Sequence, residues 1–391
     1  MRAAMRITNL PPYPFAALER TIARLVADGV DVIRMDIGSP DLPPSDEIIS
    51  TLQKSAARAD RHGYGGYFGT KQFRRAVATY YSNRFLVEVD PDSEVLLLLG
   101  SKEGIANMAL AWLDPGDIAL VPDPGYPTYS IAPLMVGAES WPMPLLETNG
   151  YLPDLSKVPD EVLSRARLMW LNYPNNPTGA VASRAFLEEA VSFCAAHDIL
   201  LCFDAPYSDN TYDGYVAPSI LEIPGAKDVA IEFNSLSKSH NLAGWRVAMA
   251  VGNRAAVQAL ALIKSNIDSG IALPIQEMAA AALTGDQSWL ASRNAIYAER
   301  RDIVIAALEA MGLKPLRPKG AIYVWTPVPG GWRAAEFADK LLLATGVSVA
   351  PGSFYGEHGE GYFRISLVQK ADRLREAMQR WQSWWRGEAV S

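Results

Sequence analysis

Short apolar runs alternate with longer amphipathic stretches through the middle of the chain. The run 95–99 is followed by a stretch with helical spacing at 101–113 and then by another apolar run, IALV. Farther along, a helical pattern at about 183–197 leads into an apolar run that ends at Asp204. Similar runs are LMWL at 168–171, VAIEF at 229–233 and VAMAV at 247–251. This alternation predicts βα units and a doubly wound, mostly parallel sheet over about residues 45–285.

The pattern changes after Gln287, where long helical stretches are separated by short strands. The expected helices are 291–311, 334–344 and 371–386, and the expected strands are AIYVW and YFRISLV. The first 40 residues add an expected helix at 15–28 and an expected strand, VIRMDIG, and they are too few to fold alone. The sequence therefore predicts a smaller α+β domain built from both ends, 1–44 and 286–391, beside a large domain at 45–285.

The composition is that of a folded enzyme. Of 391 residues, 49% are hydrophobic and 20% are charged, and at roughly 150 residues per domain the length allows two or three domains. The net charge of −7 argues against a nucleic-acid partner, because such affinity comes from clustered Lys and Arg. Cys194 and Cys202 lie in apolar stretches, which favours two buried thiols over a disulfide framework or a zinc cluster.

Several common binding motifs do not occur in the sequence. The segment GYGGYFG at 63–69 has Phe68 where a dinucleotide-binding loop needs its last glycine, and no predicted strand precedes it. The chain has no Walker loop, H-E-x-x-H or G-x-S-x-G, and its four histidines lack ligand spacing, so no metal is expected. It also has no signal-like apolar region and no run of 18 apolar residues, which favours a cytoplasmic protein without a membrane partner.

The most informative segment follows the apolar run 229–233 and contains Lys238. Ser235 and Ser237 precede this lysine, and Arg246 follows it by eight residues. Partial desolvation and nearby cations can lower the pKa of a lysine and make it a Schiff-base nucleophile. The two serines and the arginine can bind a phosphate group. Taken alone, the segment is also compatible with a surface lysine beside a serine-rich turn.

Three motifs in this order resemble those of one enzyme family. The segment S-L-S-K-x-x-x-L-A-G-W-R at 235–246 resembles the pyridoxal-phosphate lysine motif of the class I/II aminotransferases, which have fold-type I architecture. The segment NYPNNPTG at 172–179 is similar to the family's N-P-x-N-P-T-G loop, and DAPY at 204–207 is similar to its D-x-x-Y. The resemblance covers about residues 32–369. It implies pyridoxal 5'-phosphate as cofactor and a large sheet domain beside a smaller α+β domain.

The resemblance implies roles for residues around the cofactor ring. Lys238 would form the Schiff base and shuttle the proton, and Asp204 would keep the pyridine nitrogen protonated. Without the resemblance, a helix cap or a turn residue is as good an interpretation of Asp204 as a cofactor-binding residue. Asn176 and Tyr207 would hydrogen-bond the phenolic oxygen. Tyr126 would stack on the ring, although a lone tyrosine in a proline-rich turn is more often a packing residue.

Two further groups of residues are expected to bind the cofactor phosphate. Gly100-Ser101-Lys102 lies between a strand and a helix, where backbone N–H groups can bind an anion, and the resemblance places the phosphate there. It also assigns Ser235, Ser237 and Arg246 to the cofactor. Tyr64, which is followed by Gly69, matches a tyrosine that reaches the phosphate of the neighbouring subunit. The resemblance therefore implies a homodimer with shared sites.

The substrate carboxylate is expected near the carboxyl-terminal end of the chain. Arg364 lies among apolar neighbours, and a buried arginine needs an anionic partner. In the family that partner is the substrate α-carboxylate, whereas an internal Asp or Glu is the alternative. Gly38 fits a loop whose backbone approaches the same carboxylate, and Asn176 is expected beside it. The proline-rich segment 11–14 is expected to belong to an arm over the site.

These assignments predict a pyridoxal-phosphate-dependent aminotransferase whose partners are small molecules, an amino acid and a 2-oxo acid. It would move the amino group of an L-amino acid to a 2-oxo acid by a ping-pong mechanism, with 2-oxoglutarate and glutamate as one pair. Segments 100–105, 122–127 and 264–270 look most like the LL-diaminopimelate and alanine aminotransferase group, so LL-diaminopimelate is the expected donor. The alternatives are an alanine or aspartate aminotransferase, a C–S β-lyase with the same cofactor, and a ligand-binding protein that keeps the fold without catalysis.

Overall fold

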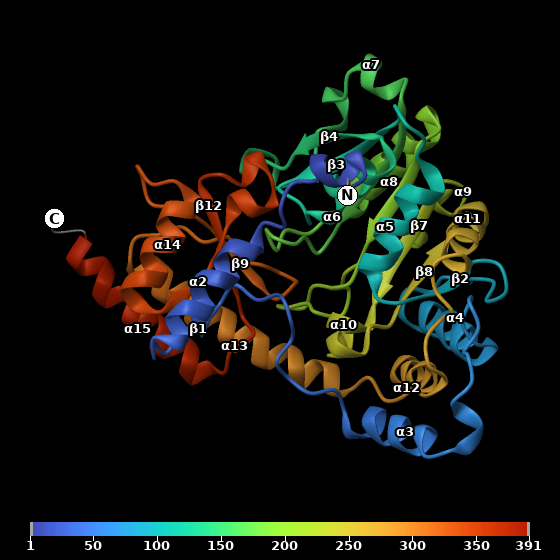
Figure 1. Ribbon diagram of the computed structural model, residues 1–391, viewed down its shortest axis with the longest axis horizontal. Helices are drawn as coiled ribbons and strands as arrows, with labels where there is room; N and C mark the ends of the chain where they lie inside the picture. The colour runs from blue at the N-terminus through green and yellow to red at the C-terminus, as the bar shows by residue number, and fades with distance from the viewer. Residues whose placement is uncertain (1–2, 389–391) are drawn as a thin grey trace.

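A seven-stranded sheet forms the centre of the larger part of the molecule (Figure 1). The computed structural model describes residues 3–388. In spatial order the strands are β2 (Val95–Leu98), β8 (Ala248–Gly252), β7 (Ala230–Ser235), β6 (Leu200–Asp204), β5 (Ala166–Asn172), β3 (Ile118–Asp123) and β4 (Glu139–Pro144). The predicted strands of this region are confirmed, and the sheet is mostly parallel.

One strand departs from the expected βα alternation. The run at 247–251 forms β8, which is antiparallel to both of its neighbours, β7 and β2. The segment between β7 and β8 folds into two short helical turns, α10 (Leu236–Ser239) and a 3₁₀ turn at Ala243–Trp245, and supplies no crossover helix. Without a crossover helix the chain returns along the neighbouring strand in the opposite direction.

Helices cover both faces of this sheet, because successive side chains of each strand point to opposite faces. Leu96 and Leu98 pack with one set of helices, whereas Leu97 packs with the other set. The first set is α5 (Ser101–Trp112), α6 (Thr128–Val136) and α11 (Arg254–Ser265). The second set includes α3 (Asp46–Ala56), α4 (Lys71–Phe85), α8 (Arg184–His197) and α12 (Leu273–Thr284). The expected helices at 101–113 and 183–197 are thus confirmed.

The smaller part combines the two ends of the chain. Its three-stranded antiparallel sheet contains β11 (Ala350–Pro351), β12 (Tyr362–Ser366) and β9 (Tyr323–Pro327). Around it lie α13 (Trp289–Ala310), α14 (Ala334–Thr345) and α15 (Ala371–Glu388), close to the expected bounds. The amino-terminal α2 (Phe15–Ala27) lies beside α14 (Figure 1). Its Leu18 and Ile22 pack on Leu342. The bounds of the predicted domains, 44/45 and 285/286, stay a prediction.

The expected strand VIRMDIG is only partly a strand. β1 is Ile33–Arg34, and it pairs in parallel with β10 (Val347–Ser348). After Met35 the chain leaves the ladder, and Asp36 and Gly38 turn into the cavity described below. The remaining short helices are α1 (Met5–Asn9), α7 (Asp160–Leu163) and α9 (Ala226–Val229). No helix within residues 3–388 is long and apolar enough to cross a membrane.

Candidate active site

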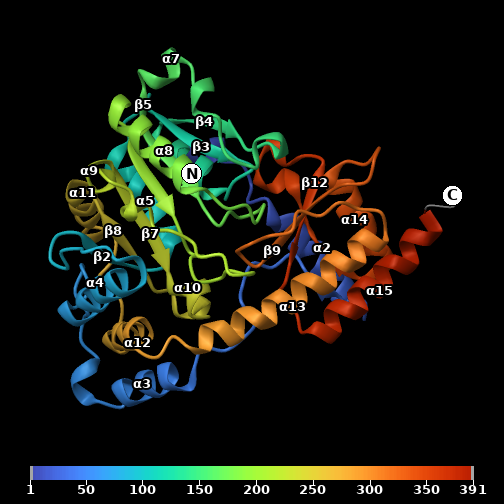
Figure 2. The same ribbon diagram turned by 180° about the vertical axis from the view of Figure 1, so that it is seen from behind.

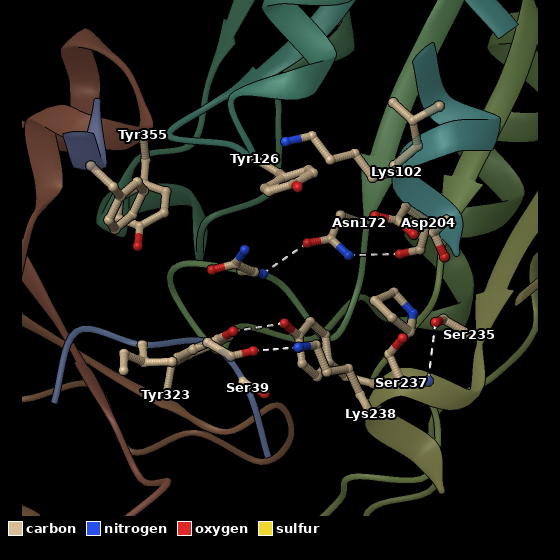
Figure 3. Close-up of a pocket in the computed structure, with 18 of the residues that line it drawn as sticks. Ser39, Lys102, Tyr126, Asn172, Asp204, Ser235, Ser237, Lys238, Tyr323 and Tyr355 are labelled. Carbon is tan, nitrogen blue, oxygen red and sulfur yellow. Dashed lines mark hydrogen bonds between the residues drawn. The ribbon is translucent and has the colours of Figure 1, made fainter. Parts of the chain in front are cut away.

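A cavity of about 440 Å³ receives side chains from both parts of the molecule (Figure 3). Twelve of the thirteen predicted site residues line it: Gly38, Ser101, Lys102, Tyr126, Asn176, Asp204, Tyr207, Ser235, Ser237, Lys238, Arg246 and Arg364. Tyr64 does not line the cavity and is 90% exposed on the loop before α4. Its predicted contact belongs to a neighbouring subunit and stays a prediction.

Lys238 lies in the short helix α10 directly after β7. Its partly buried Nζ lines the cavity and donates a hydrogen bond to the main-chain oxygen of Gly38. Burial, together with the guanidinium groups of Arg364 and Arg246, lowers the pKa of this amine to about 8. The alternative of an ordinary surface lysine is therefore wrong, because the amine is enclosed and is much more readily neutral than usual.

Asp204 ends β6 at the edge of the cavity and is 5% exposed. Tyr129 donates a hydrogen bond to Oδ2 at 2.5 Å, whereas Oδ1 has no hydrogen-bond partner in the described chain. Burial raises the pKa of this carboxyl group to about 7, which the Tyr129 hydrogen bond only partly offsets. Neither carboxylate oxygen caps a helix, so the carboxyl group remains available for a partner that donates a proton or carries a positive charge.

The segment 172–179 is locked by its own asparagines. Asn172 donates to the main-chain oxygen of Asp204 at 2.6 Å and accepts from the Asn176 N–H at 2.8 Å. Asn175 accepts from the Thr178 hydroxyl at 2.7 Å. These bonds fix the turn that presents the Asn176 side chain to the cavity.

Tyr207 shares a hydrogen bond of 2.8 Å with the hydroxyl group of Tyr323, which comes from β9 of the smaller part. Tyr323 also lies against Gly38, where a Cβ atom would collide with its hydroxyl oxygen at 2.5 Å. The glycine at position 38 is therefore needed for this close approach. The pair joins the two parts of the molecule at the wall of the cavity.

Arg364, on β12, is 3% exposed and is held by neutral oxygens. It donates to Oδ1 of Asn176 at 2.9 Å and to the main-chain oxygen of Asp36 at 2.5 Å. Its guanidinium carbon lies 4.0 Å from the centroid of the Tyr323 ring, and no group of residues 3–388 forms a hydrogen bond with its Nε. In the described chain Arg364 forms no ion pair, so an internal carboxylate partner is ruled out there. A buried cation of this kind fits an anion that comes from outside the chain.

An anion-binding cradle lies at the start of α5. Gly100 precedes the helix with φ +80°, and a Cβ atom there would collide with the Arg246 guanidinium. The Ser101 hydroxyl is buried without a hydrogen-bond partner in the described chain. On the other side, Ser235 accepts from the Ser237 N–H at 3.2 Å. Helix N–H groups, an unpaired hydroxyl and a guanidinium together suit a phosphate.

Lys102 contributes differently from its neighbour Ser101. Its Nζ lies 5.1 Å from the centroid of the Tyr13 ring, in the amino-terminal arm. Figure 3 shows its side chain passing over Tyr126, away from the serines that follow β7. The main chain of Lys102 therefore lies in the cradle, whereas its ammonium group faces the arm side of the cavity.

These features fit pyridoxal phosphate. The unpartnered Oδ1 of Asp204 suits a protonated pyridine nitrogen, and the enclosed amine of Lys238 suits the aldehyde. The cradle with the unpartnered Ser101 hydroxyl suits the phosphate. These three groups of the cofactor would thus meet polar groups that have no partner in the described chain or have a perturbed pKa.

Tyr13 belongs to the segment 11–14 that was expected over the site, whereas sequence reasoning gave no role to several other lining residues, among them Phe15, Tyr129, Asn172, Tyr323 and Tyr355. Asn172 is the first residue of the matched motif, and a polar residue at the end of β5 was a usable signal of a site position. Tyr129 follows Tyr126 at helical spacing, which was a weaker signal. Tyr323 and Tyr355 carry no local signal, because each reaches the cavity through contacts with distant segments.

Comparison with known proteins gives one consistent assignment. The family model "Aminotransferase class I and II" matches residues 30–380. The LL-diaminopimelate aminotransferase of Moorella thermoacetica is 50% identical over 380 residues, 97% of each chain, and that of Desulforudis audaxviator is 49% identical over 377 residues, 96% of each chain.

Solved structures agree with this fold. Substrate-bound BacF from Bacillus subtilis has a TM-score of 0.95 at 38% identity and covers 98% of both chains. A mutant of Thermus thermophilus aspartate aminotransferase has a TM-score of 0.92 at 27% identity and covers 98% of this chain and 100% of its own. The predicted architecture, fold-type I with a large mixed sheet of mostly parallel strands, is confirmed.

Proposed function

This chain belongs to the class I and II aminotransferases, which depend on pyridoxal phosphate, and on that premise we propose that its amino donor is LL-diaminopimelate. The acceptor would be 2-oxoglutarate, in a ping-pong cycle that releases glutamate. The observation that supports this donor is sequence identity of 50% over 380 residues with a relative named LL-diaminopimelate aminotransferase. The same name recurs among other relatives at 45–49% identity over nearly the whole chain.

Lys238 is the proposed attachment point and proton carrier. Pyridoxal phosphate, when bound, supplies an electron-withdrawing ring that stabilises negative charge at the substrate α carbon. Because the pKa of the Lys238 amine is lowered to about 8, a useful fraction is neutral near physiological pH. The neutral Nζ would act as general base and general acid, taking the proton from the substrate α carbon and later giving it back.

The remaining site residues hold the cofactor in the proposed arrangement. Asp204 would keep a proton on the pyridine nitrogen, Asn176 and Tyr207 would donate to the phenolic oxygen, and Tyr126 would stack on the ring. The phosphate would be held by the start of α5, with Ser101 and the main chain of Lys102, and by Ser235, Ser237 and Arg246.

Arg364 is the proposed partner of the substrate α-carboxylate. Its forked guanidinium is buried without an ion pair in the described chain, and the main chain of Gly38 lies on the same wall. A carboxylate that binds there would gain charge-assisted hydrogen bonds in a site of low dielectric constant.

Two charged side chains of the cavity remain for the far end of the substrate. Lys102 presents its ammonium group beside Tyr13, and Glu19 of α2 presents a carboxylate. Glu19 shares Arg34 with Asp36, at 2.6 and 2.7 Å, so two carboxylates oppose one guanidinium and one negative charge is in excess. LL-diaminopimelate has a second carboxylate and a second ammonium group. We assign the first to Lys102 and the second to Glu19.

A donor panel tests this proposal. Purified enzyme is assayed with 2-oxoglutarate and LL-diaminopimelate, alanine, aspartate, aromatic or branched donors, and Lys238→Ala is the inactive control. The highest kcat/KM is expected with LL-diaminopimelate, with parallel double-reciprocal plots. A clear preference for alanine or aspartate would overturn the donor. Release of pyruvate and ammonia from cysteine conjugates without an acceptor would support a C–S β-lyase instead.

The charged end of the cavity has a separate test. Glu19→Gln should raise KM for LL-diaminopimelate by roughly tenfold, the effect of one hydrogen bond to a charged group, and should leave KM for glutamate within about twofold. An equal rise for both donors would contradict the assignment of Glu19 to the second ammonium group.

We also propose a homodimer in which Tyr64 reaches the partner's phosphate. Tyr64, Tyr67 and Phe68 are 90%, 46% and 50% exposed on one loop, which suits an aromatic contact with a second copy. Mixing inactive Lys238→Ala and Tyr64→Ala subunits should restore activity, because one site of the mixed dimer would then be intact. No recovery after subunit exchange would contradict shared sites. A cytoplasmic location remains a proposal that cell fractionation tests.

A further inference from the structure

The loop that carries Lys238 depends on a residue outside the cavity. Arg293 lies in the second turn of α13 and is 3% exposed. Its Nη1 donates to the main-chain oxygens of Lys238, at 3.2 Å, and Ser239. Its Nη2 donates to the main-chain oxygen of Asp209 at 2.5 Å. One guanidinium therefore ties together the loop that follows β7 and the loop that follows β6.

These carbonyl groups need an outside donor. The helix α10 spans only Leu236–Ser239, so its last carbonyl oxygens have no following turn to accept from. A cation at the carboxyl end of a helical turn is also favourable electrostatically. Arg293 forms no ion pair with a carboxylate in the described chain, and its other acceptor is Oδ1 of Asn294 at 2.9 Å. Its buried charge is thus satisfied mainly by the main chain of the site loops.

The helix that carries Arg293 holds a second wall of the cavity. Figure 2 shows α13 running from the larger part to α15 of the smaller part. Seven residues after Arg293, the buried Arg300 forms a forked ion pair with Asp41 at 2.7 and 2.9 Å. Asp41 follows Gly38 by three residues, and the Gly38 oxygen accepts from Lys238 Nζ. The same helix therefore anchors the main chain of Lys238 and the loop that holds its amine.

We propose that Arg293 is a positioning residue for Lys238, which fixes the main chain of α10 so that the amine stays enclosed opposite Gly38. This inference rests on the proposed role of Lys238. With Arg293 removed, the loop loosens and water reaches the amine. The groups that face Nζ, Arg246 and Arg364, then repel it less effectively, and its proton is held more tightly.

The test compares Arg293→Met and Arg293→Lys with Arg301→Lys as a matched control. Arg301 is on the same helix, is 1% exposed and forms ion pairs with Asp213 and Asp302, not with the Lys238 loop. In the cofactor-free proteins, the pKa of Lys238 is measured by pH-dependent amine labelling with peptide mass spectrometry. Amide hydrogen exchange of 236–242 is measured in parallel. In the loaded proteins, the pH titration of the cofactor absorbance is recorded with kcat and KM.

In Arg293→Met the pKa of Lys238 should move from about 8 toward its ordinary 10.5. Amide hydrogen exchange of residues 236–242 should accelerate at least about tenfold, because the hydrogen bonds from Arg293 to this segment are lost. The kcat should fall by roughly tenfold or more, whereas KM for the donor changes less than about twofold, since Arg364 is untouched. Arg293→Lys, which keeps the charge but not the fork, should lie between wild type and Arg293→Met.

The proposal is overturned if Arg293→Met leaves the pKa of Lys238 and the exchange of 236–242 unchanged. It is also overturned if Arg301→Lys changes both as much, since that would mean general loosening of α13. If Arg293→Met does not fold, the Arg293→Lys variant is the test. A Lys238 pKa and an exchange rate equal to those of the wild type would then contradict the proposal. Amine labelling and hydrogen exchange need no substrate. If the wild-type protein had no transaminase activity, the proposed function would be wrong, but these two measurements would still test the role of Arg293.

Discussion

Two buried carboxyl groups lie on neighbouring strands of the large sheet, and burial raises the pKa of each to about 7. Asp204 ends β6, and Glu232 lies within β7, where it faces Phe203 across the ladder. Glu232 is fully buried and satisfied: it accepts from the hydroxyl groups of Tyr81 at 2.7 Å and Ser219 at 2.6 Å, and from a main-chain N–H at 3.0 Å. Within residues 3–388 the carboxylate of Asp204 accepts from Tyr129 alone, and its other oxygen has no hydrogen-bond partner there.

The comparison separates a carboxyl group that is available to a ligand from one whose hydrogen bonds all lie in the core. Burial and a raised pKa are common to both positions and do not distinguish them. The difference is the unmet hydrogen-bonding capacity of Asp204 at the carboxyl end of a strand, where the cavity lies. A buried polar group with a free oxygen marks the place where a ligand completes the structure.

The largest expected effect is on activity. Asp204→Asn should reduce kcat/KM for transamination by roughly 10²–10³-fold, because an amide cannot keep the pyridine nitrogen protonated. Glu232→Gln should leave kcat/KM within about threefold, since its partners all lie in the core. Steady-state assays of both variants, with circular dichroism as a control for folding, measure the contrast. Equal losses in the two variants would remove the distinction between the two groups.

A smaller effect is expected on the pH dependence of stability. The pKa of Glu232 in the folded protein, about 7, lies above its ordinary value of 4.5. The protonated form therefore stabilises the fold; the contribution is complete below about pH 4.5 and is lost as the pH rises through about 7. At about 1.4 kcal/mol for each pH unit the loss is about 3 kcal/mol.

Urea unfolding of the cofactor-free protein between about pH 5 and about pH 8 measures this slope. Glu232→Gln should flatten it, and Asp204→Asn should remove a similar part that arises from Asp204. Added cofactor should cancel only the Asp204 part, because only that carboxyl group faces the cavity. A slope that is unchanged in both variants would show that neither group titrates as described.

The hydrogen bonds to the two carboxyl groups give a third, smaller contrast. Tyr129→Phe removes the hydrogen bond that the Asp204 carboxylate accepts from the described chain and should raise the dissociation constant of the cofactor about tenfold, the effect of one hydrogen bond to a charged group. Tyr81→Phe removes one of three partners of Glu232 and should lower the free energy of unfolding by about 1 kcal/mol without changing cofactor affinity. Fluorescence titration with cofactor and urea unfolding test the pair, and weakened cofactor binding in Tyr81→Phe would be the unexpected result.

The smallest effect is expected at the thiols. Cys194 and Cys202 are fully buried, and burial raises the pKa of both thiols. A thiol reagent should therefore react with neither cysteine in the native protein and should leave activity unchanged. Rapid labelling of Cys202, which is two residues before Asp204, would show that β6 is more open than the structure indicates.

Much of the site was predictable because its chemistry is encoded in residue types at strand ends. Lys238, Asp204 and Asn176 all follow recognisable apolar runs, and parallel strands bring such ends to one edge of the sheet. The α/β class and most helices followed from the same periodicity. The direction of β8 could not be predicted from this periodicity, because an apolar run has the same pattern in a parallel and in an antiparallel strand.

Contacts made through main-chain atoms were beyond prediction. Arg364 reaches the oxygen of Asp36 across 328 positions, and Arg293 reaches the oxygen of Lys238 across 55. A carbonyl oxygen is present at every position, so the sequence contains no signal for which one is used. The side-chain pair of Tyr207 and Tyr323 was beyond prediction for another reason, because it depends on how the two parts of the molecule meet.

The proposed pyridoxal-phosphate site consists of the groups around Lys238 whose hydrogen-bonding capacity is unmet in the described chain. The most direct measurement is borohydride reduction of the cofactor-loaded protein followed by peptide mass spectrometry. The pyridoxyl group should be found on the peptide that contains Lys238, and the Lys238→Ala variant should carry none. Label on another lysine, such as Lys102, or no label on the loaded wild-type protein, would contradict the account.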